Sequence, residues 1–547
     1  MRVTRWMTLP LPRLCWSLFL SLGLGLSSVG TAEADSSTMD VQSDASRQDS
    51  TGEDSTWLEE ASRLVAAVLG STPMVDDLRQ LTDQIGGRPT GSVANVRSVA
   101  WAVERLRAAG VETSLESFEM PALWLETAAR ASVEGTSGAT AEGAAVSLRF
   151  APRVASMPWS PPTPEGGIAA PLVDVGLGSE DDFARVGEAV RDAFVLVETP
   201  LLEDLADLFA EYRAQVKIER RALAAGAAGV VYQGSRSRNV LYRHNASGGP
   251  STSRPMVVME RDGARRALRL LRSGHSLRLA LEIEIEGGAA YTAQSPLGTI
   301  LGAERPEEVV VVGAHLDSWG LGTGALDNGC NVAMLIDIAR QIRRLGLTPR
   351  RTIRFALWNG EEQGLHGSWG YVRNRQEELD RHVVAMSFDI GSGRIDGFFT
   401  GGRPAVAEAT RAALAPVEGL GPFAILDVPI VGTDNYDFMM EGVANLVASQ
   451  ESANYGPNYH ARSDTFDKVD LEQLRLNAAI AASVIWGYAS MDAPWGRQSA
   501  EEVEALVEST DLPDQMRGFN VWSAWEDGTR GRRSGTSSDT GTGAPSP

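Results

Sequence analysis

Apolar strand-like runs alternate with amphipathic helical stretches over residues 292–489, and this alternation limits the possible folds more than any other feature. Residues 308–313 (EVVVVG) are typical of a buried strand, and residues 331–345 repeat apolar side chains at the helical spacing. The same reasoning predicts strands at 352–358, 383–390 and 444–448 and a closing helix at 471–489. Strands that alternate with helices predict an α/β domain with a mainly parallel sheet covered on both faces.

Two blocks precede this strand–helix region. Residues 61–120 carry apolar stripes at helical spacing, so we assign residues 61–125 to an N-terminal helical part of the same domain. Residues 126–290 show short β-like runs (AFVLVE, AGVVYQ, PMVVME) between Gly- and Pro-rich turns, which predicts an inserted α/β module. The main domain then resumes over 291–495, and residues 496–547 form a C-terminal extension that we expect to be disordered from about residue 527.

The N-terminus has the pattern of a targeting signal. Arg2, Arg5 and Arg13 precede an apolar run at 15–26, and Ala32-Glu33-Ala34 resembles a cleavage site. The apolar run is shorter than the ~20 residues that a membrane span needs. We therefore expect residues 1–34 to be a signal peptide and the protein to be exported to the periplasm or the outside of the cell, with an uncleaved anchor as the alternative.

Charge and cysteine content exclude several classes of protein. The chain has 50 Lys and Arg against 71 Asp and Glu, a net charge of −21, which argues against a nucleic-acid or anionic-membrane partner. Residues 35–60 hold eight acids and one Arg, and we expect a disordered acidic tail there. Two Cys cannot make a disulfide framework or a Cys-rich zinc module.

Polar side chains follow the predicted strands at the points where these end. Functional groups gather beyond the carboxyl ends of the strands in such sheets, so these side chains should meet at one edge. Alone, each has an ordinary explanation, since acids suit a helix N-terminus and Asp is a good N-cap. The candidates are His315, Asp317, Asp327, Glu361, Glu362, Asp389 and His460.

Imidazoles and carboxylates in this number indicate a metal site. His315, Asp327, Glu362, Asp389 and His460 are too many ligands for one catalytic zinc, and they suit two zinc ions that share a carboxylate. The remaining Glu361 is a natural general base beside such a site, and Asp317 could accept the other ring N–H of His315. The other histidines (His244, His275, His366 and His382) are expected to be structural or on the surface.

The runs AHLDSWGLGTGALDNGCNVA, WNGEEQGLHGS, SFDIGSG and YHARSDT resemble those of the zinc-dependent exopeptidases of the aminopeptidase Y type. The resemblance implies a three-layer α/β/α fold with a mixed, mainly parallel sheet, and a protease-associated (PA-like) domain inserted at 126–290. It also implies roles. His315 and Asp389 would bind one zinc, Glu362 and His460 the other, and Asp327 would bridge them, with Glu361 as general base and Asp317 orienting His315.

The expected function is hydrolysis of short peptides near one terminus by a di-zinc exopeptidase. Two alternatives stay open: an acyl transferase similar to glutaminyl cyclase, which works with one zinc on the same fold, and a receptor-like relative without catalysis. Aminopeptidase, dipeptidase and carboxypeptidase activities are not distinguished, and a homodimer is an open possibility. The group that polarises the substrate carbonyl is also open, because Tyr436 lies out of register with the tyrosine that some relatives carry.

Overall fold

The computed structural model describes residues 50–136 and 147–534. The expected signal peptide and residues 35–49 of the expected acidic tail lie outside these residues. Residues 50–60 belong to helix α1 (Ser50–Leu69), so the prediction of disorder is wrong for them. Trp57, Ala61 and Leu64 of this helix are buried in the largest apolar core, which explains the order. No helix in the described part of the chain is long and apolar enough to cross a membrane.

The first sheet has eight strands and is mixed. Its central strands run parallel to one another, as the strand–helix alternation predicts, and antiparallel neighbours flank them. Residues 112–120 form an antiparallel edge strand, so the helical prediction is wrong for them. In spatial order the strands are β1 (Glu112–Met120), β10 (Tyr291–Ile300), β12 (Arg351–Trp358), β11 (Arg305–His315), β13 (His382–Ser387), β16 (Asn445–Gln450), β14 (Ile395–Phe399) and β15 (Ala424–Leu426).

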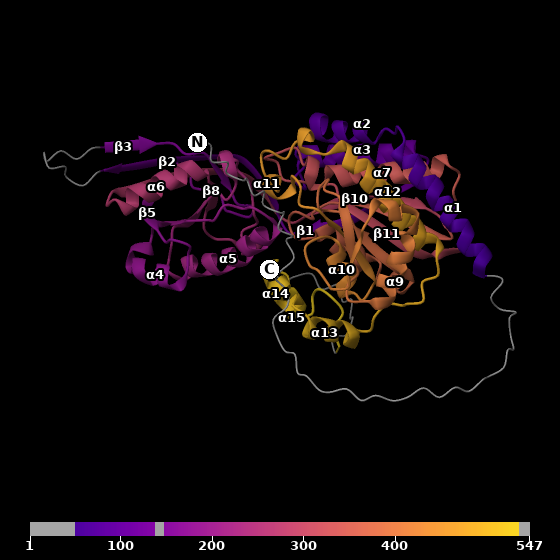
Figure 1. Ribbon diagram of the computed structural model, residues 1–547. Helices are drawn as coiled ribbons and strands as arrows, with labels where there is room; N and C mark the ends of the chain where they lie inside the picture. The colour runs from indigo at the N-terminus through magenta and orange to yellow at the C-terminus, as the bar shows by residue number, and fades with distance from the viewer. Residues whose placement is uncertain (1–49, 137–146, 535–547) are drawn as a thin grey trace, which may run out of the picture. The chain divides into compact units, whose positions relative to one another are not determined.

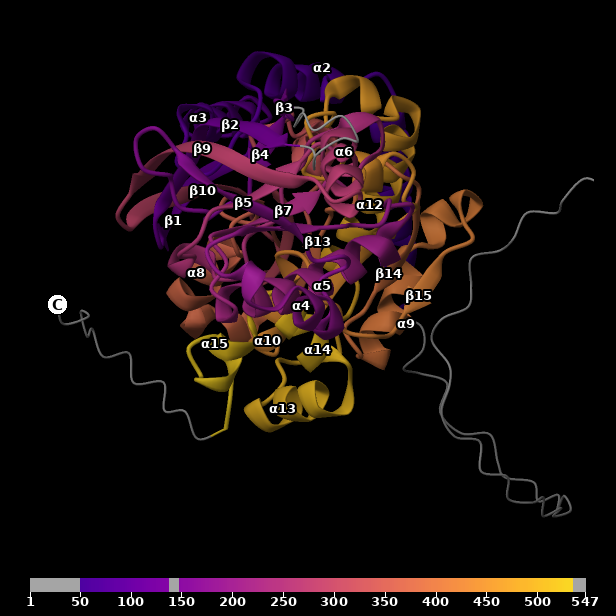
Figure 2. The same ribbon diagram turned by 90° about the vertical axis from the view of Figure 1, so that its left-hand side faces the viewer.

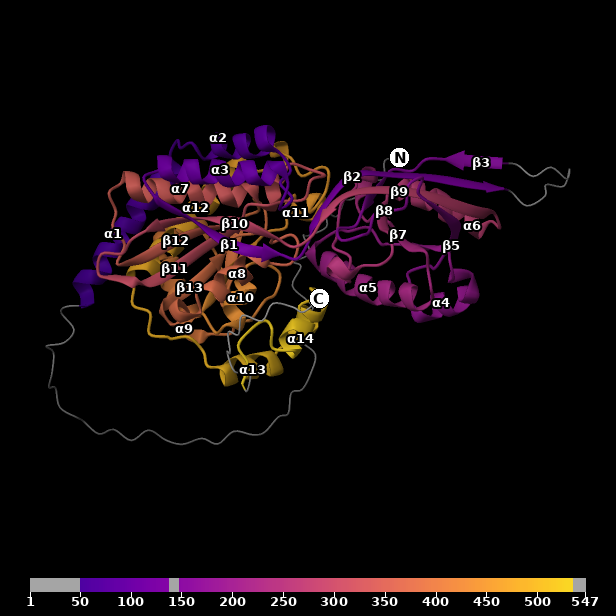
Figure 3. The ribbon, with the colours of Figure 1, turned by 180° about the vertical axis from the view of Figure 1, so that it is seen from behind.

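Helices cover both faces of this sheet (Figures 1 and 3). On one face lie α3 (Val93–Ala108), α7 (Cys330–Arg344) and α12 (Leu471–Ser490), and on the other lie α8 (His366–Asn374) and α10 (Asn435–Met440). The valines of β11 explain the three layers because side chains alternate along a strand. Val310 and Val312 are buried with α7 and α12, whereas Val309 and Val311 are buried with α8 and α10.

The second sheet is inserted in the chain between β1 and β10, and it is mixed too. Helix α6 (Arg261–Arg272) packs on one face and α5 (Leu205–Ala224) on the other (Figure 2). The strands in spatial order are β3 (Ser147–Phe150), β2 (Leu123–Thr136), β9 (Ser276–Gly288), β5 (Ile168–Asp174), β6 (Phe194–Val197), β7 (Gly229–Gln233), β8 (Met256–Met259) and β4 (Val154–Ser156).

The C-terminal extension is ordered further than expected. It forms α13 (Ala500–Ser509), α14 (Leu512–Gly518) and α15 (Trp522–Glu526), which share a buried apolar cluster with α10. Ser499 begins α13 with a capping box, in which its hydroxyl and the Glu502 carboxylate bond each other's backbone N–H. Arg530 is 6% exposed and paired with Asp437, so the prediction of disorder from about residue 527 is wrong for residues 527–534.

Candidate metal centre

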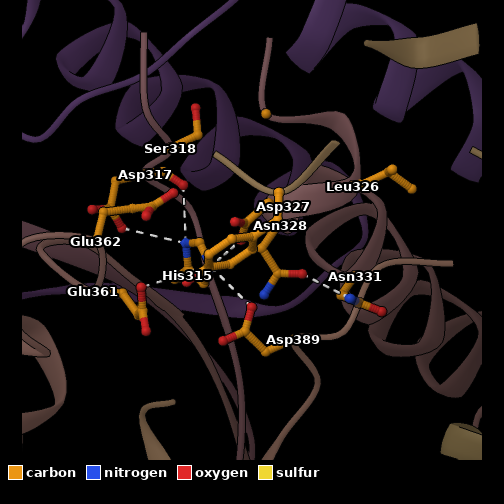
Figure 4. A network of polar contacts seen from close by, with 12 residues as sticks. His315, Asp317, Ser318, Leu326, Asp327, Asn328, Asn331, Glu361, Glu362 and Asp389 are labelled. Carbon is orange, nitrogen blue, oxygen red and sulfur yellow. Dashed lines mark hydrogen bonds and ion pairs between the residues drawn. The ribbon is translucent and has the colours of Figure 1, made fainter. Parts of the chain in front are cut away.

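The structure brings the seven candidate residues together beyond the carboxyl ends of β11, β12 and β13. Figure 4 labels all of them except His460. His315 is the last residue of β11, and its Nε2 lies 3.0 Å from Asp327 Oδ1 and 3.0 Å from Asp389 Oδ1. On the other side, His460 Nε2 lies 2.8 Å from Glu362 Oε2 and 3.4 Å from Asp327 Oδ2. The Asp327 carboxylate therefore faces one histidine with each of its two oxygens.

The other ring nitrogen of each histidine contacts a backbone carbonyl. His315 Nδ1 lies 3.0 Å from the carbonyl oxygen of Asp317, and His460 Nδ1 lies 3.0 Å from that of Arg243. A carbonyl only accepts hydrogen bonds, so both Nδ1 atoms carry the hydrogen. Both Nε2 lone pairs then point at carboxylate oxygens, an arrangement that is repulsive unless a proton or a metal ion lies between them.

Buried carboxylate oxygens without a hydrogen-bond donor also indicate a metal site. Glu362 Oε1, Glu362 Oε2 and Asp327 Oδ2 have no hydrogen-bond partner among the described residues, and their side chains are at most 4% exposed. Burying a charge is costly unless it is paired or coordinates a metal. Ligand atoms of His315, Asp327 and Glu362 also lie within 4.8 Å of one another. The donor set, two imidazoles with carboxylates, fits zinc.

The pKa values reflect the same excess of negative charge. Burial raises the pKa of the Glu362 carboxyl well above its usual value, and the nearby Asp327 raises it further. Burial lowers the pKa of His315, but the carboxylates of Asp389 and Glu361 outweigh it and hold that pKa well above the usual value. Burial lowers the pKa of His460 to about 4, so its Nε2 is unprotonated at neutral pH.

Glu361 and Asp317, which are expected to act without binding metal, lie in different positions relative to His315. Glu361 lines the adjoining cavity, and its Oε2 lies 3.9 Å from His315 Nε2. Asp317 contacts His315 Nδ1 through its main-chain carbonyl, whereas its carboxylate Oδ1 lies 3.6 Å away. The carboxylate instead accepts a hydrogen bond from Thr90 Oγ1 at 2.9 Å. The orienting atom thus belongs to the backbone, which sequence patterns do not reveal.

Arg88 and Thr90, in the IGGRPTGS segment, hold the loops of the site although the sequence indicates only a turn there. Arg88 is fully buried and donates to the carbonyls of Leu316 and Thr323 at 2.7 Å and of Gly324 at 2.9 Å, which ties the loop after β11 together. Thr90 Oγ1 accepts from the N–H of Gly360, next to Glu361, and donates to Asp317. In the sequence, a single arginine in a turn segment far from the other candidates only weakly indicates a role in the site. Its contacts with the loops form only in the folded chain.

Two further carboxylates belong to the site. Asp464 accepts from the N–H groups of Ala325 and Leu326 at 3.1 and 2.7 Å, which fixes the loop that presents Asp327. Burial raises the pKa of Asp464 to about 7. Asp434 is 1% exposed, and burial raises its pKa well above the usual value. Tyr436 is buried, and its ring packs 5.2 Å from the Arg530 guanidinium.

The inserted module reaches the site directly. Besides the contact of the Arg243 carbonyl with His460, the side-chain Nδ2 of Asn245 donates to the carbonyl of Glu362 at 2.7 Å. Arg243 is itself held by Glu126 through two hydrogen bonds of 2.8 and 3.0 Å. A cavity of about 240 Å³ adjoins the site and is lined by Glu361, Glu362 and His460.

Comparisons with known proteins point to peptidases. Residues 297–485 match the model of peptidase family M28. The chain is 28% identical to carboxypeptidase Q of Mus musculus over 341 residues, which covers 60% of this chain and 69% of that protein. It is 26% identical to aminopeptidase YwaD of Bacillus subtilis (strain 168) over 426 residues, which covers 75% of this chain and 83% of that protein.

Two solved structures share the fold. A peptidase M28 precursor from Shewanella amazonensis SB2B has a TM-score of 0.70 at 24% identity, with 81% of this chain and 99% of that chain covered. BSAP, a zinc aminopeptidase from Bacillus subtilis, has a TM-score of 0.58 at 22% identity, with 76% and 93% covered. The match of residues 297–485 to peptidase family M28, together with the relatives and the shared fold, confirms the resemblance read from the sequence.

Proposed function

We propose that the chain is an exported di-zinc exopeptidase that hydrolyses short peptides near one terminus. One observation carries the count of two ions: the two oxygens of Asp327 face different histidines, at 3.0 Å from His315 Nε2 and 3.4 Å from His460 Nε2. A carboxylate placed in this way suits a bridge between two metal ions. His315 and Asp389 would hold one ion, and Glu362 and His460 the other. Export rests on the sequence pattern of residues 1–34, and the proposal of a PA-like domain rests on the sequence resemblance of residues 126–290.

The chemistry divides between the ions and the chain. When bound, zinc supplies a Lewis acid and lowers the pKa of water to about 7. Glu361 lines the cavity beside the ligands, so its carboxylate can take a proton from the attacking water. The oxygen of the water bonds to the carbonyl carbon, the C–N bond breaks, and Glu361 returns the proton to the leaving nitrogen. Asp317 and Arg243 hold the two imidazoles in the tautomer that leaves Nε2 free.

Substitution of the base tests this proposal. Glu361→Gln keeps the size of the side chain but cannot accept the proton, so kcat should fall by about 10²–10⁴-fold. Metal analysis of the purified protein should give two zinc ions per chain in both the wild type and the variant. The substrates are a panel of free dipeptides, aminoacyl anilides and N-blocked controls, which also distinguishes dipeptidase from aminopeptidase activity.

The outcomes against the proposal are specific. Near-wild-type turnover in Glu361→Gln would reject Glu361 as the base. One zinc ion per chain would favour the cyclase-like alternative. Two zinc ions without hydrolysis of any substrate in the panel would favour a receptor-like protein.

A further inference from the structure

The cavity beside the metal centre has walls from three parts of the chain. The loop at 363–366, directly after the glutamate pair, forms one wall, and the inserted module forms the second with Tyr212 and residues 245–250. The C-terminal extension forms the third with residues 518–521 and Arg530. This extension lies beyond the 297–485 stretch that matches the peptidase family. It can therefore give this chain a pocket that the family match does not describe.

Arg530 fastens the extension to the loop behind the glutamate pair. Its Nε and Nη2 donate to the two carboxylate oxygens of Asp437 at 2.7 and 2.8 Å, and its Nη1 donates to the carbonyl of Gly364 at 3.1 Å. The guanidinium also lies 4.9 Å from the centre of the Trp369 ring. A bidentate pair of buried charges is geometrically specific, so it holds the extension in one position.

Phe519 joins the extension to the inserted module. Its ring centre lies 6.1 Å from that of Phe209 and 5.8 Å from that of Tyr212, both on α5. The Tyr212 hydroxyl lies 3.1 Å from the hydroxyl of Tyr459, whose ring stacks on His460 with centres 3.6 Å apart. An aromatic wall thus runs from the extension to a metal-ligand candidate. Such rings offer a large apolar surface to a ligand.

The cavity is small, and the arginine that lines it is already paired. Its volume of about 240 Å³ is below the ~300–1,000 Å³ of ordinary small-molecule sites. Of the described residues that line it, Arg530 is the only Lys or Arg, and Asp437 pairs with it. The amide of Gln363, which lines the cavity, is 4% exposed, and neither of its polar atoms has a hydrogen-bond partner in the part of the chain that the structure describes, so it is available to a peptide group. A carboxylate entering this pocket would meet no uncompensated cation other than the bound metals.

We infer that the C-terminal extension is the third wall of the substrate pocket and restricts the enzyme to short peptides whose side chain in this pocket is apolar rather than acidic. This inference rests on the proposed function, since it takes the cavity beside Glu361 as the place where the substrate binds. Longer peptides would collide with the wall that Phe519 makes between the extension and α5. Acidic side chains would lose their hydration without gaining a partner.

The test compares Phe519→Ala with Trp522→Ala in the full-length protein. Trp522 packs against the same apolar cluster of the extension but does not line the cavity, so its variant controls for loss of packing. The measurement is kcat/KM for free di-, tri- and tetrapeptides of leucine, and for dipeptides with glutamate in place of either leucine. Phe519→Leu, which keeps an apolar side chain, serves if Phe519→Ala does not fold. Zinc content is measured for each protein.

We expect the wild type to prefer the leucine dipeptide at least about tenfold over the tetrapeptide and over the glutamate dipeptides. Phe519→Ala should reduce the preference over the tetrapeptide to about threefold or less, Phe519→Leu should fall between, and Trp522→Ala should keep the wild-type ratio. If both Phe519 variants bind zinc and hydrolyse the dipeptide but keep the wild-type ratio of dipeptide to tetrapeptide kcat/KM, the inference is wrong, whereas the proposed function still stands. Equal rates of the wild type on all these peptides would overturn the inference too. No hydrolysis by the zinc-loaded wild type would reject the proposed function itself.

Discussion

Two buried polar clusters lie next to each other in this molecule, and they differ in how their charges are balanced. The metal cluster consists of the five proposed ligands with Glu361, and the Glu211 cluster consists of Glu211, Arg236, Tyr242 and His244 in the inserted module. The rings of His244 and His460 connect them, with centres 6.0 Å apart. In the Glu211 cluster the carboxylate accepts from Tyr242 at 2.5 Å, from Ser235 at 2.8 Å and from Arg236 at 3.5 Å.

The pKa shifts of the two glutamates run in opposite directions. Burial raises the pKa of Glu211, but His244 and Arg236 outweigh it and bring it to about 2. Burial raises the pKa of Glu362 well above its usual value, and its neighbour Asp327 raises it further. A buried carboxylate with its own cation is a structural element, whereas a group of buried carboxylates without one indicates a site for an external cation. The predictions below test this difference.

Metal removal should have the largest effect. A chelator takes away the cations that balance the metal cluster, so hydrolysis should fall at least about 10³-fold and the thermal midpoint should drop, because metal binding stabilises the folded state. Activity assays and calorimetry before and after zinc is added back measure this. Full activity of the metal-free protein would show that its carboxylates need no cation.

Asp327→Ala removes the carboxylate that faces both histidines. Without it, we expect fewer than two zinc ions per chain and a loss of hydrolysis of at least about 10²-fold. Metal analysis and activity assays measure the two effects. Asp262→Ala, which removes an acid paired with Asn239 at the start of α6, is the control. Two ions retained in Asp327→Ala would refute the bridge.

Glu211→Gln should destabilise the protein by about 3 kcal/mol, because it leaves a buried arginine without its counter-ion. The folded-state pKa of about 2 lies below the ordinary 4.5, so the charge of Glu211 stabilises the fold above pH 4.5. This contribution is lost as pH falls from 4.5 towards 2, and the stability gap between wild type and variant should shrink there. Denaturant titrations against pH measure the gap, with the exposed Glu203→Gln as control. Zinc content should stay unchanged; loss of zinc would mean that the two clusters are not independent.

Thr90→Val should have the smallest effect. It removes the hydroxyl that links the Asp317 carboxylate to the N–H of Gly360, so zinc affinity should fall about 10–100-fold, as for other residues that orient ligands. Competition with a coloured chelator measures the affinity. Thr90→Ser keeps the hydroxyl and should remain within about threefold of the wild type. Equal loss in both variants would indicate a packing effect of the methyl group instead.

The elements of the first sheet could be predicted because each is a local pattern. β11, β12 and α7 begin and end within a few residues of the predicted bounds, since buried strands and amphipathic helices have their own apolar periods. The sequence favours a helix at β1 because the burial of this strand depends on a partner, β10, that is about 180 residues away in the chain. The sequence predicts disorder for residues 50–60 at the start of α1 and for the Arg530 segment, although each buries side chains against distant elements.

The candidate ligands could be found from sequence because strand ends place them. Their supporting groups could not, since Arg88, Thr90 and Asp464 act through contacts with backbone groups more than 130 residues away. The same holds for the carbonyl of Arg243 against His460. Every residue has a backbone carbonyl, so no sequence motif can predict which carbonyl contacts a ligand.

Sequence alone was enough for the α/β class, for the chemical types of the candidate site residues and for the resemblance to the peptidase family. Tertiary structure decided which carboxylates are left unbalanced, which part of Asp317 orients His315, and that the C-terminal extension lines the cavity. The physical reason is how far apart in the sequence the interacting groups lie. Apolar periodicity depends on residues that are close in the sequence, whereas charge balance and cavity shape depend on groups that meet only when the chain has folded.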